Sequence, residues 1–210
     1  MSALTLYNYD LDENCYKVRL LLSCLGVEAD QVAVDVMPGK ENLSPRILAM
    51  SPFGALPVVR QDDLVLYEAE AILAWLARTR DPQGRFLPED PAAFGRVMMW
   101  LAFSARELDA AVQARSTAML DTPGDIDALR AAAREALRAM DDHMTRQHID
   151  GFEYFAGAEP TIADIALFPS FALSRDYNVD HDAFPALRRW ARAVRKIDGF
   201  ITMPGIPEYH

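Results

Sequence analysis

SPFGALPVV, residues 51–59, is separated by only four residues from LVLYEAEAILAWLA, residues 64–77. The runs LPVVRQ and LVLYEA each favour a strand, and Asp62 and Asp63 between them predict the turn of a β-hairpin. A helix is expected to follow from about residue 68 to 78, with its apolar stripe at Ala71, Ile72, Trp75 and Leu76. This order of elements decides the interpretation of the rest of the chain.

The residues before this stretch alternate between strand and helix patterns. LTLYNY (4–9) and QVAVDV (31–36) favour strands, residues 14–25 have helical spacing, and PRILAM (45–50) predicts a short helix. The first 80 residues therefore predict an α/β domain.

The second half of the chain is predicted to be entirely helical. DPQGRFLPEDP (81–91) contains three prolines and a glycine, so we expect a linker over residues 81–90 and a helical domain over 91–210. Four helices are expected there. They are one long helix through Val97, Trp100, Leu101, Leu108 and Val112, a second from about Asp125, a third opened by a capping box at Thr161–Asp164, and a fourth over residues 186–197, before a proline-rich tail.

Composition excludes several classes of protein. The chain has 210 residues, 51% of them hydrophobic and 25% charged, which favours a globular protein. A net charge of −10 without a basic patch argues against a nucleic-acid partner. There is no leader pattern and no apolar run of ~18 residues, so we expect a cytoplasmic protein that does not enter a membrane.

Cysteine and histidine usage predicts neither a disulfide nor a metal site. Cys15 and Cys24 are the only cysteines. On one helix they would lie roughly 13 Å apart on opposite faces, beyond the ~7 Å limit for a disulfide. The four histidines are scattered and show no metal-ligand spacing.

DENCYKVRLLLSCLG, residues 12–26, places a charge at a helix start. The apolar spacing and the final Gly26 predict a helix, with Asp12 or Asn14 as its N-cap. Helix N-termini bind anions, yet here an acidic residue stands at that position.

SPFGALPVV and LVLYEAEAILAWLA, followed by FLPEDPAAFGRVMMWL (86–101), resemble the soluble glutathione transferase superfamily, in particular its bacterial, theta-, zeta- and nu-like members. NCYKVRLLL and TIADIALF are similar to the first helix and to the capping box of that family. The resemblance implies a thioredoxin-like α/β N-terminal domain (βαβ-α-ββα, with a mixed four-stranded sheet), followed by an all-α helical bundle. It also implies a homodimer that uses glutathione as co-substrate and conjugates its thiolate to a small hydrophobic electrophile, without a metal.

The resemblance assigns several glutathione contacts. Pro57 corresponds to the family's cis-proline, which leaves the main chain of Leu56 free to pair with the ligand. Glu68 and Ala69 correspond to an acid-serine pair that holds the γ-glutamyl end. Ala69 lacks the hydroxyl donor, a loss of about 1.5 to 3 kcal/mol, while its backbone donor remains.

A second departure concerns the ligand's glycyl carboxylate. Many relatives carry a lysine where this chain has Ala55. Lys40 or Arg60 would have to supply that charge from elsewhere, although a solvated surface position fits Lys40 better.

The register of KVRLLL places Asp12 at the position of the serine or cysteine that activates the glutathione sulfur, with Cys15 three residues later. Two negative charges at ~4 Å repel by about 4 kcal/mol at an effective dielectric of ~20, which exceeds the ~2 kcal/mol that a helix dipole offers. Either Asp12 turns inward and caps the amide of Asn14 or Cys15, or the sulfur moves to Asn14. Cys15 itself could support redox chemistry if its pKa were lowered.

Other residues have weaker assignments. Tyr7 is a second candidate for contacting sulfur, although a core position fits it better. By resemblance, the second substrate would lie near Met98, Phe103, Ser104, Arg106 and Glu107. Two other functions stay open: a binding or regulatory protein that has lost the chemistry, and a glutathione-dependent thiol-disulfide oxidoreductase.

Overall fold

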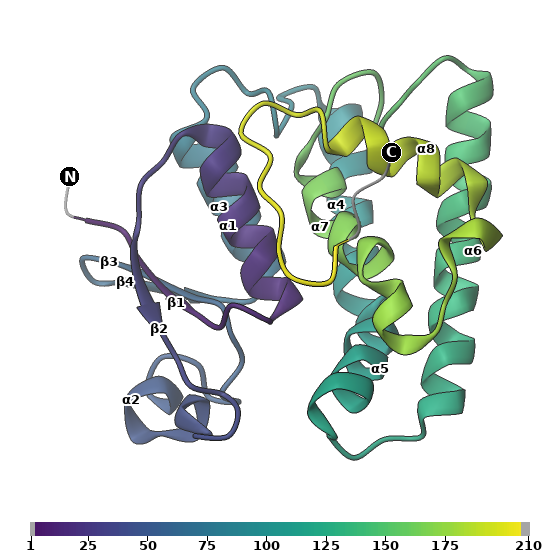
Figure 1. Cartoon of the computed structure of the whole chain (residues 1–210). Coiled ribbons are helices and arrows are strands. Elements are labelled where there is room, and N and C mark those ends of the chain that lie inside the picture. The colour runs from purple at the N-terminus through teal and green to yellow at the C-terminus, as the bar shows by residue number, and fades with distance from the viewer. Residues whose placement is uncertain (1–2, 207–210) are drawn as a thin grey trace.

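The computed structural model describes residues 3–206, so residues 1, 2 and 207–210 of the predicted domain ranges lie outside the description. A four-stranded sheet in the order β2-β1-β3-β4 forms one part of the molecule, and a group of helices forms the other (Figure 1). β1 is parallel to β2 and antiparallel to β3, which confirms the predicted mixed sheet. The strands are β1 (Thr5–Asn8), β2 (Asp30–Ala33), β3 (Val58–Gln61) and β4 (Leu64–Tyr67).

Two helices lie between the sheet and the helical part of the chain (Figure 1). The first begins after the Asp12 cap and ends at Gly26, whose φ of 63° suits a residue without a side chain. The connection from β2 to β3 carries two short helical turns outside this layer. These elements are α1 (Glu13–Leu25), α3 (Ala69–Arg80), η1 (Glu41–Leu43) and α2 (Pro45–Leu48).

The hairpin prediction is confirmed, but the predicted buried face of α3 was partly wrong. Ala71 is exposed and Trp75 is half-buried. α3 packs against α1 on one side and α7 on another, so its inward face is centred about one residue further along the helix. The buried residues of α3 are Ala69, Ile72, Leu73, Leu76 and Ala77.

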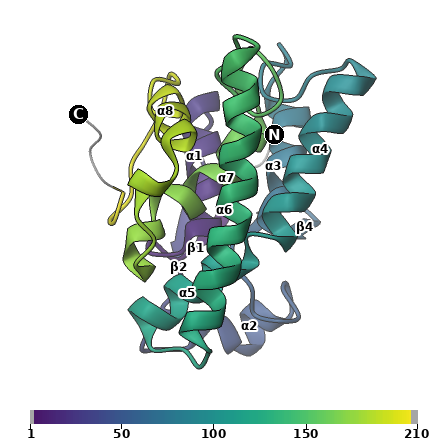
Figure 2. The ribbon, with the colours of Figure 1, turned by 90° about the vertical axis from the view of Figure 1, so that its right-hand side faces the viewer.

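The helical part begins with two helices where one long helix was predicted. The amides of Glu107 and Leu108 both donate to the Phe103 carbonyl, at 2.8 and 3.4 Å, and the chain turns there so that Leu108 is fully buried. Figure 2 shows the longest helix, α6, crossing this part. The elements are α4 (Pro91–Arg106), α5 (Asp109–Leu120), α6 (Ile126–Ile149), α7 (Ile162–Ala172), η2 (Ser174–Tyr177), η3 (His181–Ala183) and α8 (Pro185–Val194).

The predicted capping box opens α7, which is buried along its whole length. The Asp164 carboxylate accepts hydrogen bonds from the amides of Thr161 (2.9 Å) and Phe155 (3.0 Å) and from the Trp190 indole (2.9 Å). A charge without such partners would be costly at this depth. Asp164 thereby joins α7 to α8 and to the loop that precedes α7.

After α8 the chain returns along α1 (Figure 1). The Tyr16 hydroxyl of α1 donates to the Ile201 carbonyl at 2.6 Å, and a Cβ at Gly199 would lie 2.5 Å from the Ser23 carbonyl oxygen. This close approach requires a glycine. Among the described helices, none combines the length and the apolar character that crossing a membrane needs.

Candidate functional site

One edge of the sheet brings together segments that are far apart in the sequence. Tyr7 near the end of β1 pairs with Val58 at the start of β3, and Val58 pairs with Tyr67 at the end of β4. β2 is parallel to β1 and ends at the same edge. Four segments therefore meet there: the residues that lead into α1, the loop with Lys40, the residues before β3 and the start of α3.

Leu56 and Pro57 lie at this edge, immediately before β3. The Leu56–Pro57 peptide is cis, which confirms the prediction from the resemblance. A second cis peptide, Met37–Pro38, was not predicted from the sequence. Sheet pairing starts at Val58, so the main chain of Leu56 lies outside the paired register.

α3 presents its N-terminus beside these residues. Glu68 is exposed, has a φ of 73° and makes no side-chain bond to the helix, while Ala69 is buried as its first residue. The first amides of an α-helix have no acceptor within the helix. They form a ready anion site next to a carboxylate that can accept from an ammonium group.

Asp12 adopts the capping arrangement, one of the two alternatives left open by the sequence. Its Oδ1 accepts the amide of Cys15 at 2.7 Å. Burial raises the pKa of Asp12, while the hydrogen bond from the Cys15 amide and the charge of Lys17 act in the opposite direction. The carboxylate is therefore turned toward the helix backbone.

The thiol of Cys15 is fully buried and accepts the Tyr9 amide at 3.4 Å. Burial and the charge of Asp12 raise its pKa well above the ordinary value, which disfavours the thiolate and removes support for redox chemistry at Cys15. Cys24 is also buried, and both thiols are free, as predicted. Asn14 is half-buried, and its side-chain amide makes no hydrogen bond within residues 3–206.

The two cations considered for the glycyl carboxylate lie in different places. Lys40 is exposed in the loop after β2, on the site's edge of the sheet. Arg60 lies within β3 opposite Thr5, toward the other edge, so only Lys40 remains near the site. Tyr7 is buried in a small apolar cluster with Val34, Ile47 and Val58, which confirms its core position.

A pocket of about 260 Å³ lies between the start of α1 and α5. α5 lines this pocket, whereas the α4 residues that the resemblance places near the second substrate are not among its lining residues. Those α4 residues are Met98, Phe103, Ser104, Arg106 and Glu107, and their role stays a prediction. The pocket's polar lining includes Asp12, Glu13, Arg115 and Asp176, and its apolar lining includes Tyr9, Leu11, Val36, Val112, Met119 and Leu120.

Sequence reasoning missed two charged residues at this pocket. Arg115 of α5 is buried, pairs with Asp176 at 2.8 Å and donates to the Leu11 carbonyl at 2.6 Å. Glu13 is 3% exposed, and burial raises its pKa to about 7 against the opposing charges of Lys17 and Arg115. Nothing in the local sequence distinguishes Glu13 from an ordinary acid in a first helical turn.

A buried polar network supports the start of α3 from behind. Lys17 donates to Glu70 at 2.9 Å and to Ser104 at 3.1 Å, and the Ser104 hydroxyl donates to Glu70 at 2.8 Å. Burial acts to raise the pKa of Glu70, but the Lys17 charge and the two hydrogen bonds outweigh it and lower the pKa. The network joins α1, α3 and α4 one residue from Ala69.

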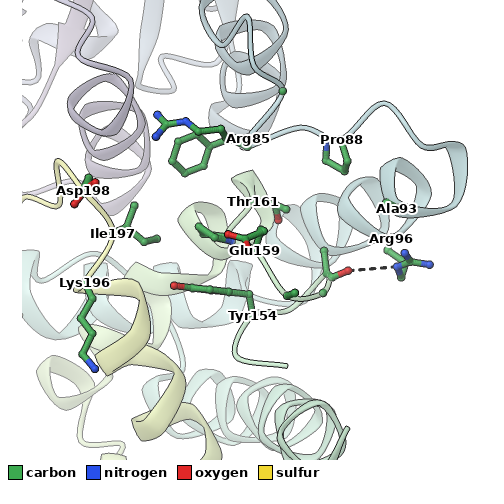
Figure 3. A pocket seen from close by; sticks show the side chains of 16 residues that line it. Arg85, Pro88, Ala93, Arg96, Tyr154, Glu159, Thr161, Lys196, Ile197 and Asp198 are labelled. Atoms are coloured by element: carbon green, nitrogen blue, oxygen red, sulfur yellow. Dashed lines mark hydrogen bonds between the residues drawn. The ribbon is translucent and has the colours of Figure 1, made fainter. Parts of the chain in front are cut away.

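A larger cavity, of about 730 Å³, lies near the opposite end of α1 (Figure 3). Arg85 at its rim donates to the Cys24 carbonyl at 3.2 Å, and Arg96 donates to the Ala156 carbonyl at 3.4 Å. The 13 residues of α1 span ~20 Å, so this cavity is remote from the sheet edge described above. In the described part of the chain, no group of three or more acidic, histidine or cysteine residues could hold a metal ion.

The mixed sheet with its helices, followed by a helical bundle, defines a protein with a thioredoxin-like N-terminal part and an all-helical C-terminal part, and a pocket lies between α1 of the first and α5 of the second. The family models for the glutathione S-transferase N-terminal and C-terminal domains match residues 6–84 and 123–193. The chain belongs to the soluble glutathione S-transferase superfamily.

Individual relatives agree with this assignment. The chain is 30% identical over 201 residues to a maleylacetoacetate isomerase of Rhizobium meliloti, covering 93% of this chain and 92% of the relative. It is 25% identical to glutathione S-transferase D6 of Drosophila melanogaster, over 91% and 87% of the two chains. A crystal structure of a glutathione S-transferase from Pseudomonas fluorescens superposes with a TM-score of 0.86 at 27% identity, covering 97% of this chain and all of the other.

Proposed function

We propose that this protein is a glutathione transferase that binds glutathione at the sheet edge and adds its thiolate to a small hydrophobic electrophile. The observation that carries the proposal is the meeting, at one edge, of the unpaired main chain of Leu56, the start of α3 and the pocket beside α1. Family membership supports it, since the named relatives include glutathione S-transferases.

Each part of the tripeptide has a partner in this proposal. The main chain of Leu56 pairs with the cysteinyl backbone, the Ala69 amide donates to the γ-glutamyl carboxylate, and Glu68 accepts from the ammonium group. Lys40 is the cation available for the glycyl carboxylate, because it lies in the loop that leaves this edge.

The sulfur lies at the start of α1, with Asn14 as the donor that stabilises it. The Asn14 side chain has unused hydrogen-bond capacity, whereas Asp12 is engaged with the Cys15 amide. Because the thiolate is the nucleophile, hydrogen bonds that favour it over the thiol increase the rate of attack. The electrophile occupies the apolar pocket of about 260 Å³, which favours a compact molecule.

The main alternative is a binding or regulatory protein that has kept the fold without the chemistry. Asp12, Ala55 and Ala69 favour it, since each lacks a group with which relatives hold or activate glutathione. No observation favours the oxidoreductase alternative at Cys15, because that thiol is buried.

The proposal includes a cytoplasmic homodimer. Several apolar side chains stand in solvent in the single chain, among them Phe53 with 85% of its surface exposed and Met99 of α4 with 55%. Where exposed apolar side chains lie together in one patch, they mark a surface that a partner can cover. Light scattering should give twice the 23.5 kDa of one chain, and a mass near one chain would reject the dimer.

Calorimetric titration with glutathione, followed by assays with a panel of electrophiles and of disulfides, tests the function. Binding heat together with conjugation of a chloronitrobenzene or an activated alkene is the expected result. The absence of heat at millimolar glutathione would reject the enzyme. Binding without turnover across the panel would favour the alternative.

A further inference from the structure

Glu13 is a buried carboxyl for which the proposed function has no role. It is the first residue of α1, follows Asp12 and lines the same pocket. Its Oε2 accepts from the Ser170 hydroxyl at 3.5 Å, and its Oε1 has no hydrogen-bond partner in the part of the chain that the structure describes. An acceptor oxygen that is buried and left without a protein donor is rare in native proteins, and a ligand or a water molecule in the pocket can bring the missing donor.

Four structural elements, α1, α5, α7 and η2, contribute charged or polar side chains near Glu13. Asp12 and Lys17 belong to the start of α1, and Ser170 belongs to α7. Arg115 of α5 contributes a positive charge, but its side chain is held by Asp176 of η2 and by the Leu11 carbonyl. The charge of Glu13 also contributes, after burial, to the raised pKa of Tyr177 of η2. None of these residues donates a hydrogen bond to Oε1.

We propose that Glu13 is the proton acceptor for the glutathione thiol, directly or through one water molecule. This inference rests on the proposed function, because it requires the sulfur to lie at the start of α1. The S–H bond breaks, its proton forms an O–H bond with Glu13, and the electron pair stays on sulfur for attack on the electrophile. The proton then passes to solvent or to the product.

The charge balance of the pocket favours this transfer. An ionised thiol added beside the acidic side chains of Asp12 and Glu13 would introduce a further negative charge into a poorly hydrated site. When the thiol proton moves to Glu13, the number of negative charges is unchanged. The raised pKa of Glu13, about 7, suits a group that exchanges a proton near neutral pH.

The decisive variant is Glu13→Gln, which keeps the size of the side chain but cannot accept the proton in this way. The dissociation constant of glutathione is measured by calorimetry, and kcat with a chloronitrobenzene is measured as a function of pH. Glu135→Gln is the matched control, since Glu135 is an exposed acid on α6.

We expect Glu13→Gln to bind glutathione with an unchanged dissociation constant at a pH below 7, to lower kcat by about 100-fold, and to lose the rise of kcat with pH that ionisation of Glu13 gives the natural protein near pH 7. Glu135→Gln should behave as the natural protein. If Glu13→Gln binds glutathione and keeps both the kcat of the natural protein and its pH profile, the role of Glu13 is rejected while the proposed function stands. If the natural protein gives no binding heat, the proposed function fails, and this inference fails with it.

Discussion

Replacing Glu13 by Gln should remove one contribution to stability that is lost as the pH rises. Burial raises the pKa of Glu13 from 4.5 to about 7, so the folded state holds its proton more tightly than the unfolded state. The carboxyl's contribution to stability is therefore fully present below pH 4.5 and is lost as the pH rises through 7.

The size of the effect follows from the two pKa values. At about 1.4 kcal/mol for each pH unit between them, ionisation of Glu13 costs the folded state at most about 3.4 kcal/mol. About 2 kcal/mol of this cost should develop between pH 5 and pH 7. For a chain of this length, that difference corresponds to about 4 to 8 °C in Tm.

The assay is thermal unfolding of the natural protein and of Glu13→Gln at intervals from pH 5 to pH 8. The natural protein should lose stability relative to the variant as the pH rises. A new amide left without partners would displace the whole curve by a constant amount, so the change with pH is the test. Burial lowers the pKa of His181 to about 4, so its contribution to the free energy of unfolding increases as the pH rises. Both proteins contain His181, so this contribution cancels in the difference between them. Parallel curves would refute the reasoning, because they would mean that Glu13 ionises in the folded protein as it does in the unfolded chain.

Three further substitutions test the remaining parts of the site. Asp12→Ser should increase the rate of glutathione conjugation, because it removes a negative charge beside the sulfur and adds a hydroxyl donor; an unchanged or lower rate would contradict the repulsion argument. Ala69→Ser should tighten glutathione binding by about tenfold in calorimetry through a hydrogen bond to a charged group, and equal affinity would show that the ligand does not reach this position. Lys17→Met leaves Glu70 buried without its cation and should lower the free energy of unfolding by about 3 to 5 kcal/mol in urea titrations, with much of the loss recovered in a double variant with Glu70→Leu. A loss below 1 kcal/mol would mean that water already screens this pair.

The sequence was sufficient for those features that depend on neighbouring residues. The spacing of apolar residues predicted the sheet, the hairpin and most helices, including the start of α6 near Asp125, and the capping box placed the start of α7 correctly. The cis peptide before Pro57 was predicted because the stretch SPFGALPVV resembles the family's cis-proline motif. The single long helix was wrong because Leu108 fits the helical period equally well in a continuous helix and at a turn.

Features of the site that depend on contacts between distant segments were decided only by the tertiary structure. The sequence left two positions open for Asp12, and the folded chain selects the cap on Cys15. It gave no reason to single out Glu13, whose burial comes from α5, α7 and η2, about 100 residues or more away in the chain. Apolar periodicity and helix caps involve residues that are close in the sequence, so they can be recognised along the chain. The pKa of a carboxyl instead depends on every charge and every apolar group that folding brings around it.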